Sequence, residues 1–258
     1  IQQDPDQGQP ATERTEVRFA YSRTTLYMGV TCYDSHPEQL KGNNMLRDGS
    51  LVSDDRFMWA LDPLLDGRSG YSFEMNPSGA MADSLLVFSF ASGGGSVRNW
   101  DGIWYAKVNK SDIGWTIEIE IPFSTMNFDP SAPAWGVNFQ RTVRRRNEES
   151  LWTGWLRNQR LINMSLAGLL EGISDVSQGV GLEIQPYGTA SYVDAKGRGG
   201  SSDFEPDGAV DFNYSITPQL KGNLTINTDF AETEVDQRRV NLTRFPLVDF
   251  SGQMVSPP

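Results

Sequence analysis

The chain has 258 residues, of which 38% are hydrophobic and 11% aromatic, which is enough for one large β domain or for one domain with part of a second. Its formal net charge of −11 argues against nucleic acid as a partner, because a protein that neutralises phosphates needs a basic face. The 25 glycines and 14 prolines suit many short strands joined by tight turns. We therefore expect an all-β protein.

Apolar and polar residues begin to alternate near the start of the chain. Residues 16–21 and 26–33 alternate on either side of a short polar turn, which predicts a hairpin. The single cysteine, Cys32, excludes an internal disulfide, and its place in this alternation indicates a core residue and not a nucleophile. The single histidine, His36, follows in a turn, so a zinc site or a histidine-based triad has little support.

Residues 54–79 predict a second hairpin, around which the first part of the chain is organised. Phe57, Trp59 and Leu61 alternate on its first strand, and Tyr71 and Phe73 on its second. Acidic residues at its ends offer oxygen ligands for a calcium ion. They are Asp54, Asp55, Asp62 and Asp66. The alternative is that they cap turns, since Asp is a common turn residue.

Further strands follow at residues 80–90, 115–121 and 135–143. The strand at 115–121 has the clearest pattern, because Trp115, Ile117, Ile119 and Ile121 alternate with polar residues. Many short antiparallel strands at this spacing are typical of a β-sandwich, here jelly-roll-like. We expect this domain to cover residues 1–172.

The pattern changes after a glycine-punctuated connector, and residues 173–258 form a second predicted region. Three segments, 182–193, 209–216 and 220–230, have one thinly apolar face and one polar face. This weak alternation is typical of strands in a membrane barrel, and an ordinary soluble hairpin set remains the alternative. We expect antiparallel strands of a partial barrel or a ribbon, in a chain processed from a longer precursor.

Several motifs together resemble a known family. They lie at residues 15–21, 26–30, 53–57, 70–77, 100–104, 114–123, 135–139, 144–148, 185–187, 223–230 and 240–246. Taken together they are similar to carbohydrate-binding module family 9, in a bacterial subgroup whose module is fused to uncharacterised outer-membrane-type β-barrels. The resemblance implies a non-catalytic sugar-binding sandwich at the cell envelope, in the outer membrane or facing the periplasm.

Aromatic and polar residues at loops and strand ends are candidates for the sugar site. Flat rings cover the apolar face of a pyranose, and amides or carboxylates bind its hydroxyls. The candidates are Tyr71, Asn76, Asp83, Arg98, Trp100, Asp101 and Trp104. The alternative is that Trp104 and Trp115 pack in the core, since strand aromatics mostly do.

Other functions have less support in the sequence. Glu118 and Glu120 share one strand face, but no pocket feature accompanies them as glycoside hydrolysis requires. A haem site would need His36 and a methionine as axial ligands, and nothing fixes that pair, so no haem is expected. The competing hypothesis is an envelope protein, for assembly or transport, whose sandwich contacts other proteins. A sugar site would differ from it in having an aromatic ring open to solvent.

Overall fold

The computed structural model describes residues 1–87, 95–179, 182–193, 203–217 and 220–227. It has two compact units, of which the first is Ile1–Leu182 with Ser215–Lys221 and the second holds the remaining described residues. The strands are β1 (Gln2–Asp4), β2 (Thr15–Tyr21), β3 (Thr25–Tyr33), β4 (Arg56–Asp62), β5 (Gly70–Met75), β6 (Met81–Val87), β7 (Gly95–Val97), β8 (Tyr105–Ser111), β9 (Gly114–Pro122), β10 (Ala134–Val143), β11 (Glu148–Leu151), β12 (Gly168–Glu171), β13 (Leu182–Val193), β14 (Asp203–Thr217) and β15 (Leu220–Ile226). The helices within these residues are single 3-10 turns: η1 (Pro37–Gln39), η2 (Phe123–Thr125), η3 (Arg144–Arg146) and η4 (Met164–Leu166).

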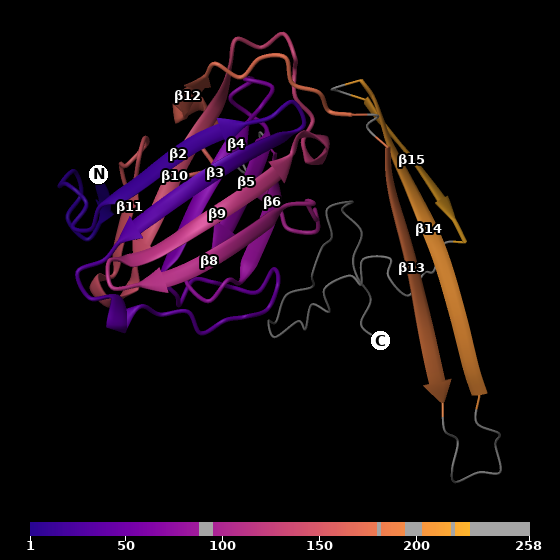
Figure 1. The fold of residues 1–258 in the computed structure, drawn as a ribbon, viewed down its shortest axis with the longest axis horizontal. Coiled ribbons are helices and arrows are strands. Elements are labelled where there is room, and N and C mark those ends of the chain that lie inside the picture. The colour runs from indigo at the N-terminus through magenta and orange to yellow at the C-terminus, as the bar shows by residue number, and fades with distance from the viewer. Residues whose placement is uncertain (88–94, 180–181, 194–202, 218–219, 228–258) are drawn as a thin grey trace, which may run out of the picture. The chain divides into compact units, whose positions relative to one another are not determined.

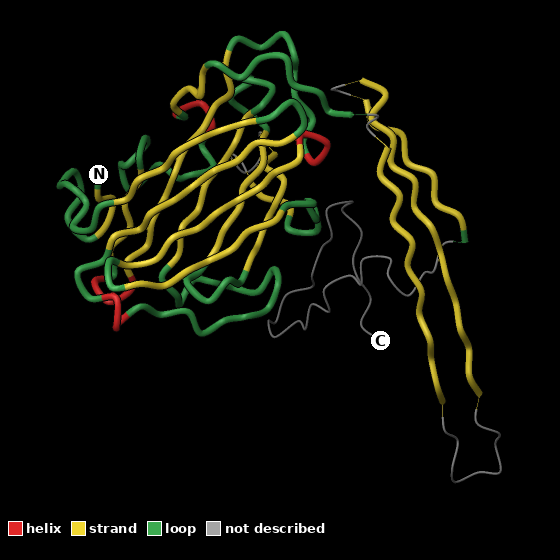
Figure 2. The backbone as a smooth tube through the Cα atoms, viewed as in Figure 1, coloured by secondary structure: helices red, strands yellow, loops and turns green. Residues whose placement is uncertain are grey.

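Two antiparallel sheets form the first unit. The larger sheet has the order β1-β11-β10-β4-β5-β6-β7, with β12 also paired to β10, and the smaller has the order β2-β3-β9-β8. The smaller sheet lies in front of the larger one in Figure 1, and Figure 2 shows that the loops gather at the two ends of these layers. The predicted all-β antiparallel sandwich is confirmed.

Alternation along each strand decides which side chains enter the space between the sheets. On β9, Ile117, Ile119 and Ile121 are buried, whereas Glu118 and Glu120 between them are exposed. A strand directs successive side chains to opposite faces, so this pattern needs one buried and one solvated face. The predicted orientation of this strand is confirmed.

Aromatic rings fill the centre of the sandwich. The Trp59 ring stacks on Phe73, with ring centroids 5.2 Å apart, and meets the edge of Trp104 at 5.4 Å. Cys32 is fully buried at the same interface, and burial raises the pKa of its thiol to about 11. Cys32 is therefore a core residue, as its place in the alternation predicts.

The opposite face of the larger sheet is covered in part by the segment between β11 and β12. Ala60 and Leu86 on this face pack with Leu161 and Met164 of the segment. The predicted strand at residues 80–90 ends at Val87 among the described residues, and positions 88–90 lie outside them.

The second predicted region contains a three-stranded sheet in the order β13-β14-β15. β14 starts at Asp203, earlier than the predicted residue 209, because the poor strand formers Pro206 and Gly208 obscure the pattern there. Residues 228–230 of the last predicted strand lie outside the described part of the chain. Among the described residues, no helix has the length and apolar character needed to cross a membrane.

Candidate functional site

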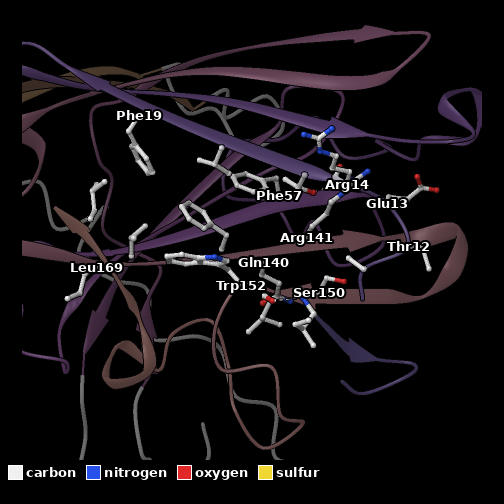
Figure 3. A pocket seen from close by; sticks show the side chains of 18 residues that line it. Thr12, Glu13, Arg14, Phe19, Phe57, Gln140, Arg141, Ser150, Trp152 and Leu169 are labelled. Atoms are coloured by element: carbon white, nitrogen blue, oxygen red, sulfur yellow. Dashed lines mark hydrogen bonds between the residues drawn. The ribbon is translucent and has the colours of Figure 1, made fainter. Parts of the chain in front are cut away.

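A cleft opens along one flank of the sandwich, where β2 lies opposite β10, β11 and β12. Its volume is about 720 Å³. We call it the flank cleft, and it is lined by Ile1, Ala11, Thr12, Glu13, Arg14, Thr15, Val17, Phe19, Phe57, Val137, Phe139, Gln140, Arg141, Ser150, Leu151, Trp152, Leu169 and Leu170. In Figure 3, Phe19 and Leu169 lie at one end of the cleft, and Thr12, Glu13 and Arg14 at the other. The cleft therefore has an apolar part and a polar end.

Trp152 dominates the apolar part. Its side chain is half exposed, at 52% of the full area, and its ring centroid lies 5.6 Å from that of Phe139. The ring also lies over Gly168, where an added Cβ would come within 2.3 Å of it. Trp152 thus occupies the gap between β11 and β12, both of which pair with β10. One side of the indole rests on protein, and much of its surface stays open to solvent.

Arg141 joins the two sheets beside the polar end of the flank cleft. Its guanidinium donates to the carbonyl oxygens of Arg14, at 2.9 Å, and Tyr33, at 2.7 Å. It also donates to Thr15 Oγ1 at 3.2 Å and lies 3.5 Å from a carboxylate oxygen of Asp34. Since the side chain is buried, these partners hold it in place, and its charge is compensated within the protein.

Hydroxyl and amide groups at the polar end are oriented by two glutamates. The hydroxyls of Thr12 and Ser150 donate to Glu148, at 2.5 Å and 3.0 Å, and the amide of Gln140 donates to Glu149 at 3.2 Å. A hydroxyl that donates one hydrogen bond can still accept others. The polar end therefore presents acceptor groups in fixed positions.

Glu13 completes the polar end. Its carboxylate accepts hydrogen bonds from the backbone N–H and the hydroxyl of Ser35, at 3.1 Å and 2.6 Å, and pairs with Arg145. Burial acts to raise the pKa of Glu13, but the hydrogen bonds from Ser35 and the pairing with Arg145 outweigh it, so the pKa lies below its usual value. Glu13 is thus ionised and held in one geometry at neutral pH.

Four of the predicted sugar-binding residues are buried and have structural partners. Trp104 is only 4% exposed, and its Nε1–H donates to Asp83 at 2.7 Å. Asn76 is fully buried and donates to Asp54 at 2.7 Å, while the hydroxyl of Tyr71 accepts from the backbone N–H of Asn127 at 2.9 Å. The structure thus places Trp104 in the core, which is the alternative that its strand pattern offered.

The other three predicted sugar-binding residues lie nearer the surface. Trp100 is half-buried, with its ring centroid 4.9 Å from that of Tyr71. Asp101 and Arg98 are exposed, and Arg98 lies 3.9 Å from Glu74. These residues follow β7, the edge strand of the larger sheet, and we call Arg98, Trp100 and Asp101 the loop site.

The acidic residues predicted to bind calcium are divided among separate loop networks. Asp54 accepts from the backbone N–H groups of Asn43 and Asn44, at 3.1 Å and 3.0 Å. Asp55 accepts in the same way from Lys41 and Arg144, at 2.6 Å and 2.7 Å. Asp62 accepts from Gly67 at 2.7 Å, and Asp66 from Arg68 and Ser69 at 2.7 Å and 2.8 Å. Backbone N–H groups of the surrounding loops therefore already bind all four carboxylates, and calcium binding by these residues stays a prediction.

A different set of carboxylates comes together beside the loop site. Oxygens of Asp48, Asp83 and Asp101 lie within 4.8 Å of one another, the one such group of three among the described residues. Asp83 already accepts from Trp104 and from the backbone N–H of Gly102, and it pairs with Arg47. Burial raises the pKa of Asp83. These contacts use both oxygens of Asp83 for the fold.

Sequence reasoning did not find the flank cleft or Trp152. One signal was available, because Trp152 directly follows a short strand and precedes Thr153-Gly154, the kind of position that singled out Trp100. The openness of its ring, however, depends on contacts with β10 and β12 that are distant in sequence.

Comparison with known proteins gives distant likenesses only. No protein-family model and no curated protein matches the chain. A carbohydrate-binding module family 9 domain from Caldicellulosiruptor kristjanssonii is similar in its glucose complex (16% identity, TM-score 0.47) and in its cellotriose complex (17%, 0.46), each covering 65% of this chain and 80% of that one. A candidate carbohydrate-binding protein from Bacteroides uniformis is 13% identical with a TM-score of 0.49, covering 63% and 79%. At this distance no ligand or site residue is transferred to this chain.

Proposed function

We propose that this protein binds a carbohydrate without catalysis and that the flank cleft is its site. The observation that carries the proposal is the half-exposed indole of Trp152, held in a concave apolar cleft next to fixed polar groups. A pyranose has an apolar face of C–H groups and a rim of hydroxyls, so it needs both a flat ring and hydrogen-bonding partners. The apolar part of the cleft supplies the flat ring, and the polar end beside it supplies the hydrogen-bonding groups.

The arrangement favours stacking on Trp152, with the hydroxyls of the sugar directed to the polar end. Phe139 and Gly168 support the indole from the protein side, so a sugar would cover a ring that is already held in place. Thr12, Ser150 and Gln140 are oriented before a ligand arrives. Such preorganisation lowers the entropy cost of binding.

The loop site is the second candidate position for the same function. Trp100 has part of its ring surface open, with Arg98 and Asp101 beside it. Tyr71, Asn76, Asp83 and Trp104 would then support this site from below. Calcium binding by Asp54, Asp55, Asp62 and Asp66 stays a prediction, which the same experiment tests.

The test is a glycan-array and affinity-gel screen of the full chain, run with calcium and with chelator. We expect binding to at least one glycan, at least tenfold weaker in Trp152→Ala, because stacked aromatic residues are typical hot spots. Trp100→Ala is the matched control, and a loss of binding in that variant alone would move the site to the loop site. Absence of binding to any glycan would contradict the proposal, and sensitivity to the chelator would support calcium.

An envelope location is a further proposal, with an assembly or transport role as the second candidate function. The observation that favours it is the set of exposed apolar side chains at alternate positions on β13 and β15: Leu182, Ile184, Leu224 and Ile226. Alternation of this kind suits a lipid-facing strand. Flotation of the full chain with phospholipid vesicles tests it. We expect co-flotation that Leu224→Ser/Ile226→Ser reduces, and a chain that stays in the dense fraction would contradict it.

A further inference from the structure

The outer face of the smaller sheet carries a second constellation of rings and charges. Strand register places Tyr27, Glu120 and Tyr105 in one row across β3, β9 and β8. The next row on the same face holds Gly29, Glu118 and Lys107. Because paired residues share a face, these side chains all point away from the core.

A groove of about 650 Å³ includes these two rows. Tyr27 and Tyr105 are 38% and 60% exposed. Gly29 lies two residues from Tyr27 on β3 and directly opposite Glu118, and a Cβ added there would meet no atom within 4 Å. The missing side chain therefore leaves open space on the face, next to the accessible ring of Tyr27.

Arg47 also lines this groove and pairs with Asp48 and Asp83, but the charged groups of the two rows differ from those of the flank cleft in having no partner. Lys107 faces Glu118 in register, yet within the described part of the chain neither forms an ion pair or a side-chain hydrogen bond, and neither does Glu120. The flank cleft has its Arg141 and Glu13 fully engaged. The groove thus keeps free acceptors and a free donor beside its rings.

Charges of both signs argue for a neutral occupant. Glu118 and Glu120 lie beside Lys107, and Arg18 pairs in register with Gly29 on the adjoining strand. A strongly anionic or cationic partner would meet like charge in each case, which costs binding energy. Tyr27 and Tyr105 lie on the two strands that flank β9, whose backbones are about 9.5 Å apart. This spacing suits an extended molecule with more than one ring to cover.

We propose that this face is a second saccharide contact surface, which binds an extended neutral polysaccharide chain lying across β3, β9 and β8. The inference rests on the proposed carbohydrate binding and adds a ligand class, the long chain, and a second surface. One long polysaccharide chain can contact both the flank cleft and this face of the same protein molecule. Neighbouring polysaccharide chains of one insoluble particle can do the same. Linking two weak contacts in this way raises apparent affinity, and a short oligosaccharide cannot provide that link.

The experiment compares short and long forms of the same sugar on the full chain. The probes are cellotriose with amorphous cellulose, xylotriose with xylan, and mannotriose with mannan. For the pair that binds, we expect Tyr27→Ala/Tyr105→Ala to weaken polysaccharide binding at least tenfold and to leave trisaccharide binding unchanged. Tyr27→Phe/Tyr105→Phe, which keeps the rings, should retain most of the polysaccharide binding.

Thr31→Ala/Asn109→Ala is the matched control, because these residues lie on the same strands and outside the groove lining. Polysaccharide binding that is equal in the tyrosine double variant and the wild type would overturn the inference and leave the proposed function standing. No binding of any probe by the wild type would overturn the inference, and a negative glycan array as well would overturn the proposed function with it. Thermal unfolding of each variant shows that the sheet is intact.

Discussion

The flank cleft and the region of the loop site, where Trp104 lies in the core beside Trp100, both contain tryptophan next to polar groups, but the protein uses the rings differently. Trp104 and Trp100 turn toward Trp59, Phe73 and Tyr71, so most of their surface is taken by the core. Trp152 has Phe139 on one side and solvent over about half of its area. The comparison teaches that residue type and loop position do not make a binding ring, because what packs against the ring decides whether it is available.

The largest expected effect is a loss of stability when the buried Trp104 is replaced. Trp104→Ala removes a side chain that packs on Trp59 and Phe73 and bonds Asp83, so it should lower the free energy of unfolding by about 3–5 kcal/mol. Trp152→Ala mainly loses one ring pair and should cost about 0.5–1.5 kcal/mol. Urea unfolding followed by circular dichroism measures both. Equal losses would contradict the division into core ring and open ring.

The next largest effect tests whether saccharide binding needs the close packing of the Trp152 ring on Gly168. Gly168→Ala would bring a methyl group into the Trp152 ring, which must move because the ring lies at the end of a flexible side chain. We expect saccharide affinity to fall about tenfold, which corresponds to about 1.4 kcal/mol, with little change in stability. Isothermal titration measures the affinity. Gly172→Ala is unsuitable as a control, since Gly172 has a positive φ of 86°. Gly95→Ala is suitable, because its added Cβ meets nothing within 4 Å and Gly95 lies in neither proposed binding surface.

A smaller effect is the pH dependence of stability, which differs between Glu13 in the flank cleft and Asp83 beside the loop site. The folded-state pKa of Glu13 is lowered, so its stabilising contribution is complete above the unfolded value of about 4.3 and is lost as the pH falls through the folded-state pKa. The pKa of Asp83 is raised by burial, so its ionisation opposes folding as the pH rises. Glu13→Gln should therefore flatten the loss of stability below about pH 4. Urea unfolding at several pH values checks this, and an unchanged acid slope would contradict the assignment.

The smallest effect is expected at the loop site. Trp100→Ala should change saccharide affinity by less than twofold, because its ring packs on Tyr71 and Phe73 and the bound sugar would lie elsewhere. A tenfold loss would make the loop site the binding site and reverse the comparison.

Local alternation made most of the sandwich predictable. Ile117, Ile119 and Ile121 are inward on β9 as predicted, whereas Trp104, a predicted sugar-binding residue with core packing as the alternative, is buried in the core. The flank cleft was not predictable in the same way, because Trp152 is kept open by the gap between β11 and β12. That gap arises from the pairing of both strands with β10, a contact between residues far apart in sequence.

The predicted calcium ligands also depend on contacts that the sequence does not reveal. Asp54 and Asp62 look like metal ligands by residue type and hairpin position, and their loops turn out to supply backbone N–H partners for them. Which oxygens are already engaged depends on loop conformation, and that is set by contacts such as Asn76 with Asp54. The domain boundary at residue 172 and the fusion to a barrel remain predictions.

The most direct test of the central claim is to follow the indole N–H signals of the seven tryptophans by NMR during a saccharide titration. Trp152→Phe identifies the Trp152 signal by its loss. The account predicts that this signal shifts as a glycan from the screen is added, while the buried Trp59 and Trp115 signals stay in place. Saturable binding with an unmoved Trp152 signal would contradict it.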